Sequence, residues 1–195
     1  MSKKCYRYYG GLLSAQEKWL NSMAVKGYRL VRAERLLYEF EECSPGQYQY
    51  CIEFVGHKSR ESTDDYRIFL EDLGYKVFTK NINLNYSIGK VRYRPWAEKG
   101  GRIATHSTTY DRELLIVEKE NDGKMFEMHT SCDDKILYCK NVRKPWLFLC
   151  LLCLIFGIGF HSLIFDIFSV ITLIPCIVYQ AEIIKLNQKT KISEE

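Results

Sequence analysis

The longest apolar pattern in the chain runs from Pro145 to Gln180 and contains no Lys, Arg or Glu. Its only acidic residue is Asp166, and its only histidine is His161. A run of 18 or more apolar residues is typical of a membrane-spanning helix, and this one is too long for a single span. A buried helical hairpin of a soluble domain is the alternative, but the apolar density favours the membrane.

A break in this pattern is expected at Gly157, Gly159, His161 and Ser162. We therefore predict a transmembrane helical hairpin over residues 145–184, with helices over about 145–160 and 163–184. Helices over 146–160 and 163–184 would be roughly 22 and 33 Å long at about 1.5 Å per residue. The first is short for a hydrocarbon core about 30 Å thick.

His161 and Asp166 are the candidates for function inside this segment, because membrane helices rarely retain ionisable residues. Both fall near the expected hairpin tip. Asp166 lies in the first turn of the second helix, where a carboxylate meets the positive end of the helix dipole. The sequence therefore favours a structural role for this pair.

Basic residues flank the apolar segment on both sides. They are Lys135, Lys140, Arg143 and Lys144 before it, and Lys185, Lys189 and Lys191 after it. Basic flanks remain in the cytoplasm, and the N-terminal residues lack the apolar region of a signal peptide. We expect a multi-pass protein of the cell membrane with both termini cytoplasmic. Its parts would be a cytosolic domain over 1–144 and a cytoplasmic tail over 185–195.

Helical spacing recurs near the N-terminus. Ser14 and Glu17 have the spacing of a capping box that would start this helix. The residues that share its apolar face are Trp19, Leu20, Met23 and Ala24. Trp19 is the largest of them and is expected to be buried in the core. Gly27 is expected to end the helix in the C′ position.

Strand-like patterns surround this helix. Cys5–Tyr9 is a short candidate, and residues 28–41 are strand-like with a possible break near Ala33–Glu34. Residues 48–54 alternate strictly between aromatic or aliphatic and other side chains. Because Pro45-Gly46 is a turn signal, we expect the strand before it to pair antiparallel with residues 48–54 as a hairpin.

A second helix is expected to begin at Ser62 and Asp65. Its apolar stripe consists of Tyr66, Phe69, Leu70 and Leu73. Gly74 would end it, and residues 75–79 return as a strand. The resulting order β-α-β-β-α-β predicts an α+β fold with a ferredoxin-like sandwich.

Residues 80–112 carry several Asn and Gly residues and predict a loop or irregular insertion. Residues 113–118 and 125–129 resemble strands joined by Asn121-Asp122-Gly123, a strong hairpin signal. Ser131 then opens a short helix through Val142 that leads into the membrane segment.

The motif Trp19-Leu20-x-x-Met23-Ala24-x-x-Gly27-Tyr28-x-Leu30 resembles a bacterial family of unknown function. Further matching residues are Glu17, Tyr38, Phe40, Pro45, Gly46, Tyr48 to Phe54, Gly74 and Tyr75. Members are common in Gram-positive bacteria and are often encoded beside PadR-like regulators. The resemblance covers about residues 5–78 and, more loosely, 113–144, while residues 80–112 depart from it. It implies C-terminal membrane helices but no activity, cofactor or catalytic residue.

Charge and cysteine content add little chemistry. The net charge of +4 does not specify nucleic acid. The eight cysteines of a cytosolic domain are expected to be free thiols. Cys150-x-x-Cys153 resembles a redox motif, but its place inside a membrane helix favours apolar packing.

Two patterns suggest binding chemistry but are better explained structurally. His129 and Cys132 could ligate a metal, yet no second pair has zinc-like spacing. Lys90, Arg92 and Arg94 alternate with apolar residues, as in some single-strand binders, but an ordinary strand with one solvated face has the same pattern. We therefore expect no metal, no cofactor and no catalytic site, and regard nucleic acid as an improbable partner.

The leading hypothesis is a non-enzymatic, membrane-anchored regulatory or adaptor protein whose cytosolic domain binds a protein partner or a small ligand. The alternative is an accessory or immunity-type subunit of a membrane complex that acts through its transmembrane hairpin. An enzyme with an unrecognised site is the third hypothesis. Exchange of the hairpin for an unrelated anchor distinguishes the first two hypotheses, because only an adaptor would keep its function after the exchange.

Overall fold

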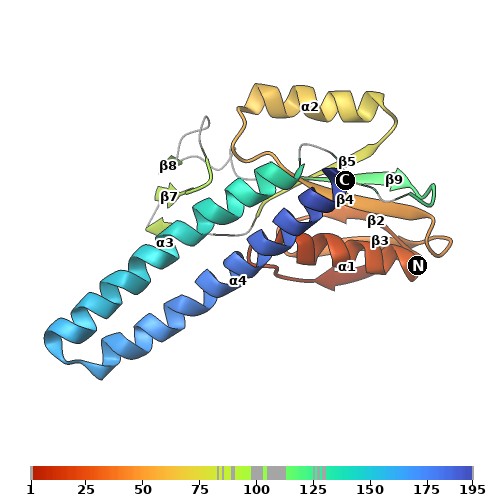
Figure 1. Cartoon of the computed structure of the whole chain (residues 1–195). Helices are drawn as coiled ribbons and strands as arrows, with labels where there is room; N and C mark the ends of the chain where they lie inside the picture. Colours follow the sequence, from red (N-terminus) through yellow and green to blue (C-terminus); the bar gives the residue numbers. More distant parts are fainter. Residues whose placement is uncertain are drawn as a thin grey trace. The chain divides into compact units, whose positions relative to one another are not determined.

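The computed structural model describes residues 2–82, 84, 86–88, 91–97, 103–104, 113–124, 126, 128 and 131–194. The chain divides into two compact units, Met1–Ser131 and Cys132–Glu195 (Figure 1). The first unit contains the β-strands and two helices, and the second consists of two long helices. The chain is therefore a mixed α+β protein with two C-terminal apolar helices, as the sequence predicts.

The first sheet is built from β1 (Ser2–Tyr6), β2 (Tyr28–Ala33) and β3 (Leu37–Glu42), with α1 (Leu13–Val25) between β1 and β2. Strand β3 lies between the other two and is antiparallel to both, so β1 and β2 are parallel. The strand-like residues 28–41 are therefore broken after Ala33, where the pattern indicated a break, and fold back as a hairpin. The predicted N-terminal strand begins and ends three residues earlier than the pattern indicated.

The second sheet repeats this arrangement with β4 (Tyr48–Phe54), α2 (Arg60–Asp72), β5 (Lys76–Lys80) and β9 (Leu114–Glu120). Here β9 is the central strand, antiparallel to both β4 and β5. The predicted hairpin between residues 36–40 and 48–54 is wrong. Both edges of β3 are occupied by β1 and β2, and β4 pairs along its whole length with β9.

Two split β-α-β arrangements thus replace the single four-stranded sheet expected of a ferredoxin-like sandwich, and that topology is not confirmed. A third small sheet of β6 (Tyr86–Ile88), β7 (Val91–Tyr93) and β8 (Ile103–Ala104) forms where the sequence predicts a loop. The strand expected over 125–129 lies mostly outside the described residues. In Figure 1, α1 and α2 lie on opposite sides of the strands of the first unit.

The predicted start of each helix in the first unit is wrong. Helix α1 has Leu12 at its N-cap, with no side-chain cap. The carboxylate of Glu17 instead accepts a hydrogen bond from Ile52 N–H at 2.9 Å. Helix α2 begins after Ser59, whose hydroxyl accepts from Ser62 N–H. The predicted ends are confirmed, because Gly27 and Gly74 follow the C-caps with φ values of 82° and 85°.

Helix α1 covers the open edge of β4. The side-chain amide of Asn21 donates to Tyr50 O at 2.8 Å, and its oxygen accepts from Tyr50 N–H at 2.9 Å. Together with Glu17, this amide supplies the hydrogen bonds that a neighbouring strand would otherwise make. An exposed strand edge promotes aggregation, so α1 protects this edge as well as packing on it.

Trp19 is only half-buried, contrary to expectation. Its ring contacts Tyr38 and Phe40 of β3 edge-on, at centroid distances of 4.9 and 5.5 Å. The Arg7 guanidinium lies over the Trp19 ring, 5.1 Å from its centroid. The fully buried core is instead formed by other large side chains, among them Tyr38, Phe40, Tyr50, Phe54, Leu70, Trp96, Leu114 and Leu115.

The second unit consists of α3 (Ser131–Phe160) and α4 (Leu163–Glu194), joined by His161 and Ser162 (Figure 1). The short helix predicted before the membrane segment and the first helix of that segment form one continuous helix, α3. Pro145 therefore lies inside α3 rather than at its start. The two helices pack through small residues. The Cys150 thiol lies 3.6 Å from both the carbonyl and the hydroxyl oxygen of Ser169.

Replacement of Asn21 tests whether α1 holds the edge of β4. We expect Asn21→Ala to lower the free energy of unfolding by about 1–3 kcal/mol, because it leaves both backbone groups of Tyr50 without a partner. Chemical denaturation of the full chain in mild detergent measures this. Ser22→Ala is the matched control, because the Ser22 hydroxyl donates to Trp19 O within its own helix. Equal losses for both variants would contradict the assignment.

Candidate functional site

Strands β2 and β5 are in contact, and a pocket lies at each end of this junction. The first pocket, about 320 Å³, is lined by Arg29, Tyr48, Tyr75, Lys76, Glu118 and Lys119, among others. The second, about 400 Å³, is lined by Ala33, Glu34, Arg35, Thr79, Lys80 and Asn81. Both pockets are formed by residues of the two sheets, which places candidate binding residues where the sheets meet.

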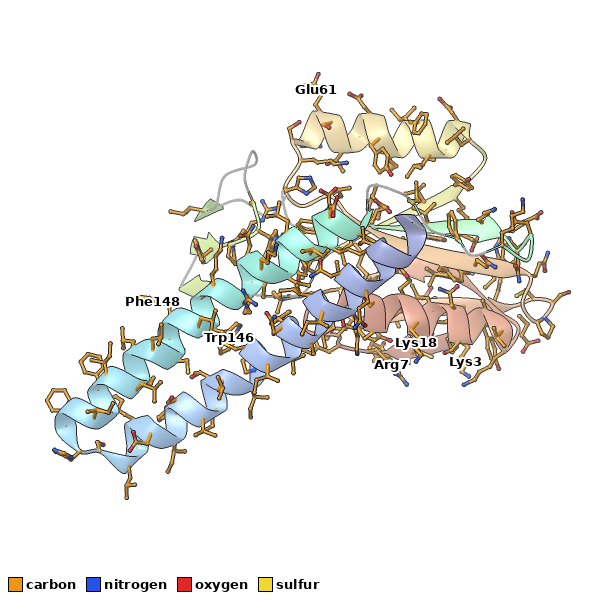
Figure 2. All side chains as sticks on the ribbon, in the orientation of Figure 1. Lys3, Arg7, Lys18, Glu61, Trp146 and Phe148 are labelled. Carbon is orange, nitrogen blue, oxygen red and sulfur yellow. The ribbon has the colours of Figure 1, made fainter. Side chains whose placement is uncertain are left out.

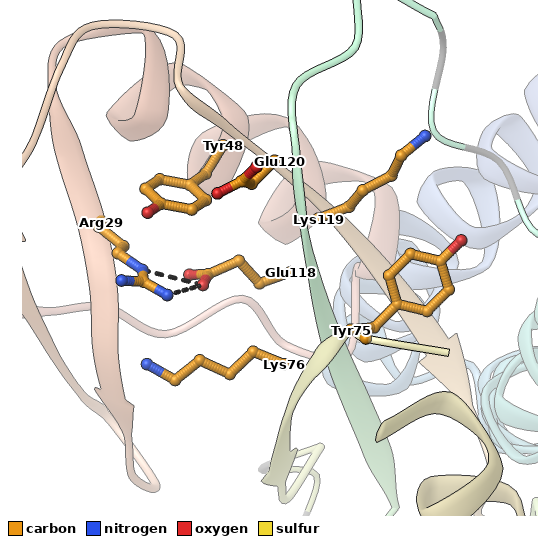
Figure 3. A pocket seen from close by; sticks show the side chains of 8 residues that line it. Arg29, Tyr48, Tyr75, Lys76, Glu118, Lys119 and Glu120 are labelled. Atoms are coloured by element: carbon orange, nitrogen blue, oxygen red, sulfur yellow. Dashed lines mark hydrogen bonds and ion pairs between the residues drawn. The ribbon is translucent and has the colours of Figure 1, made fainter. Parts of the chain in front are cut away.

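A buried carboxylate forms the floor of the first pocket. Glu118 of β9 is 3% exposed. One of its oxygens accepts from Arg29 Nε at 2.9 Å and from Nη2 at 2.7 Å (Figure 3). The other accepts from the Tyr50 hydroxyl at 2.8 Å. That hydroxyl in turn accepts from Leu30 N–H at 2.7 Å, so one network joins β2, β4 and β9.

The charges of this network stabilise one another. Hydrogen bonding to Glu118 raises the pKa of Arg29, and burial raises the pKa of Tyr50. The Arg29 guanidinium also lies 4.3 Å from the centroid of the Tyr48 ring and 3.7 Å from the Glu41 carboxylate. The Arg29 guanidinium therefore has hydrogen-bond, ion-pair and aromatic partners within the protein, and its chief role is to join the two sheets.

The second pocket contains a buried lysine. Lys80, the last residue of β5, is 3% exposed. Its ammonium donates to Glu34 O and, at 2.9 Å, to Arg35 O. It also lies 4.5 Å from the centroid of the Tyr38 ring. Burial lowers the pKa of Lys80 to about 8, so this amine loses its proton far more readily than an ordinary lysine.

A third buried polar group, Glu113, precedes β9. Its carboxylate accepts from Arg94 Nε at 3.0 Å, from Trp96 Nε1 at 3.2 Å and from Ile82 N–H at 3.2 Å. Burial raises the pKa of Glu113 despite the neighbouring arginine. Arg94 is therefore not on the solvated face of a basic strand, as the alternating pattern suggested.

The other candidates from the sequence are not brought together. Lys90, His129 and the side chain of Arg92 lie outside the described residues. Among the described residues, no cluster of three or more His, Cys, Asp or Glu side chains could hold a metal ion. No sequence pattern distinguishes Lys80 or Glu118, because each occupies an ordinary strand position.

His161 and Asp166 lie at the hairpin tip, as expected. His161 has a φ of 50°, which is uncommon for a residue other than glycine, and forms the turn between the helices. Asp166 is exposed in the first turn of α4. A Cβ atom at Gly157 would clash with Asp166 Oδ1, so this glycine leaves room for the carboxylate against α3.

Comparison with known proteins identifies a family but no activity. Residues 13–151 match the model of a family described as "Protein of unknown function (DUF2812)". This match includes the 80–112 segment and extends into α3. The comparisons with curated proteins and with solved structures gave no match.

Removal of one hydroxyl tests the network around Glu118. We expect Tyr50→Phe to lower the free energy of unfolding by about 1–3 kcal/mol, because Leu30 N–H and one Glu118 oxygen lose their partner inside the protein. Tyr48→Phe is the control, because it keeps the ring beneath Arg29. Denaturant unfolding of both variants gives the comparison, and a Tyr50→Phe variant as stable as the control would refute the network.

The pH dependence of stability tests the burial of Lys80. The pKa of Lys80 is about 8 in the folded chain against an ordinary value of 10.5. Between these values the unfolded chain binds the proton that the folded chain has lost, so this group makes stability rise with pH through that window. We expect the rise, measured by denaturant unfolding from pH 7 to pH 10, to be smaller in Lys80→Met. Parallel pH profiles for the two proteins would contradict the burial.

Proposed function

Because this chain belongs to the DUF2812 family, whose description assigns no activity, we propose a function from its own surfaces. We infer that it is a membrane-anchored regulatory or adaptor protein without a catalytic reaction of its own. The α3–α4 hairpin anchors it in the cell membrane, and the α+β unit binds a small ligand or a protein partner.

The exposed apolar side chains of α3 and α4 carry this proposal (Figure 2). Phe148, Ile158 and Leu163 are 68, 73 and 77% exposed. Only 22% of the most apolar window of each helix is buried. Each large apolar side chain left in water forgoes about 1.5–3 kcal/mol of burial free energy, and contiguous apolar surfaces of this kind mark contact sites. A lipid bilayer covers such a surface on all sides.

The lengths of the helices fit a bilayer better than the sequence indicated. Helices of 30 and 32 residues span about 45 and 48 Å at about 1.5 Å per residue, which exceeds the hydrocarbon core of about 30 Å. The first span is no longer short, since α3 begins well before Pro145. The surplus turns of both helices carry the basic residues Lys140, Arg143, Lys144 and Lys185, which favours cytoplasmic ends for both.

The contacts between the two helices also suit a membrane. Cys150 of α3 lies against Ser169 of α4, and Gly157 lies against Asp166. Small residues at helix contacts let backbones approach closely in membrane proteins, where no hydrophobic effect drives association. The hairpin is therefore a plausible unit of insertion by itself.

The alternative function is that of an accessory subunit that acts through the hairpin. One observation favours it, namely the exposed carboxylate of Asp166 beside α3. An ionisable group of this kind could contact another membrane protein. In that case the α+β unit would be a cytosolic cap, and the hairpin sequence itself would be essential.

Exchange of the hairpin distinguishes the two functions and tests the anchor. We expect the full chain to remain in the membrane fraction after alkaline carbonate extraction, and reporters fused to either terminus to report a cytoplasmic location. A variant with residues 145–184 replaced by an unrelated two-helix anchor should co-purify in mild detergent with the same proteins as the natural chain.

Asp166→Asn provides the matched control for the alternative. It keeps the size of the side chain and loses the charge, which is worth about 0.3–1 kcal/mol at a helix N-terminus, so insertion should be unchanged. Loss of the co-purifying proteins in this variant, or in the exchanged hairpin, would favour the accessory subunit. Release of the natural chain by carbonate would refute the anchor.

A further inference from the structure

The ammonium of Lys80 is a buried charge whose described partners carry no negative charge. Two backbone carbonyls, of Glu34 and Arg35, accept its hydrogen bonds, and the Tyr38 ring lies beside it. Within the described ranges, no carboxylate lies within ion-pair distance of Lys80. The nearby Glu34 side chain pairs instead with Arg32. Carbonyl oxygens stabilise an ammonium but do not neutralise it.

Two other buried charges in the same unit are paired with an arginine, and a third, Glu53, lies 3.9 Å from the Cys51 thiol. Glu118 is paired with Arg29, and Glu113 is paired with Arg94. A buried charge without a partner is costly, and proteins usually pair it or let it bind an ion. Lys80 therefore differs from Glu113 and Glu118, because no oppositely charged side chain among the described residues neutralises it.

The space beside Lys80 is a pocket of suitable size and polarity. It has a volume of about 400 Å³, within the range of small-molecule sites. Besides Lys80 and Ala33, it is lined by Glu34, whose carboxylate pairs with Arg32. The other lining residues are Arg35, Thr79 and Asn81, whose guanidinium, hydroxyl and amide groups can donate hydrogen bonds. The lining thus offers donors and positive charge, a combination that suits an oxyanion better than a cation or an apolar molecule.

We propose that this pocket binds a small oxyanion, a carboxylate or phosphate group of a small molecule, through the Lys80 ammonium. The bound anion neutralises the buried charge. It also lies between the β2–β3 turn and the end of β5, so its binding strengthens the junction between the two sheets. The site lies wholly within the α+β unit and does not depend on the membrane anchor.

Thermal unfolding of the full chain in mild detergent tests the site, with sulfate, phosphate and acetate as probes against chloride at equal ionic strength. At about ten times its dissociation constant, a binding anion should raise the melting temperature by about 3–6 °C. A larger rise with phosphate than with acetate indicates a phosphate group as the natural ligand, and the reverse indicates a carboxylate. Lys80→Met should abolish the rise. Lys76→Met is the control, because Lys76 is exposed at the other end of the same strand.

The pH dependence of sulfate binding separates this site from a general salt effect. Sulfate keeps its charge between pH 6 and pH 10, whereas Lys80 loses its proton above about pH 8. The dissociation constant should therefore rise by up to about tenfold per pH unit above that value. A general stabilisation by salt would not follow this profile and would persist in Lys80→Met.

A chemical test avoids reliance on a variant that could fold poorly. Amine acetylation of the unsubstituted protein, mapped by mass spectrometry of its peptides, should be slower at Lys80 in the presence of sulfate and unchanged at Lys76. The proposal is overturned if no probe raises the melting temperature more than chloride does, or if Lys80→Met retains the full rise in melting temperature. It is also overturned if sulfate leaves the acetylation rate of Lys80 unchanged. Each of these outcomes is independent of whether the hairpin anchors the protein.

Discussion

The α+β unit depends on one buried carboxylate, that of Glu118. Strand β9 inserts between β4 and β5 and places Glu118 where it accepts hydrogen bonds from Arg29 of the first sheet and Tyr50 of its own sheet. Removal of one partner from a buried pair leaves an uncompensated charge, which typically costs about 3–5 kcal/mol. Leu30 N–H donates to the Tyr50 hydroxyl, and the Tyr48 ring lies against the Arg29 guanidinium. These further contacts hold the same two sheets together. Two small sheets thereby behave as one unit.

This junction also determines where ligands can bind. The two pockets lie at opposite ends of the contact between β2 and β5, and they differ in charge balance. In the first, Arg29 and Glu118 neutralise each other, whereas in the second the described partners of the Lys80 ammonium are two carbonyl oxygens and the Tyr38 ring. A ligand that neutralises Lys80 would stabilise the junction between the two sheets. The two proposals do not depend on each other.

The sequence predicted the ends of α1 and α2 and the apolar helices, because local chemistry determined them, but it mispredicted where α1 and α2 begin. Gly27 and Gly74 end helices in backbone conformations that favour glycine, and the apolar segment after Pro145 forms long helices. Long-range pairing was not predictable, since β4 is equally compatible with β3 or with the distant β9. The same limit applies to the sites. Lys80, Arg94 and Glu118 resemble solvated strand residues, and only the tertiary fold buries them. Glu17 resembled part of a capping box, yet it bonds across to β4.

Hydrogen exchange at the Leu30 amide tests the junction most directly. This amide donates to the Tyr50 hydroxyl across the two sheets, not to a neighbouring strand. If the network joins the sheets, the Leu30 amide should exchange as slowly as the amides of the central strand β9, because both would require global unfolding. Rapid exchange at Leu30 beside slow exchange in β9 would show that the sheets separate independently. That result would contradict the joined α+β unit and the pockets that depend on it.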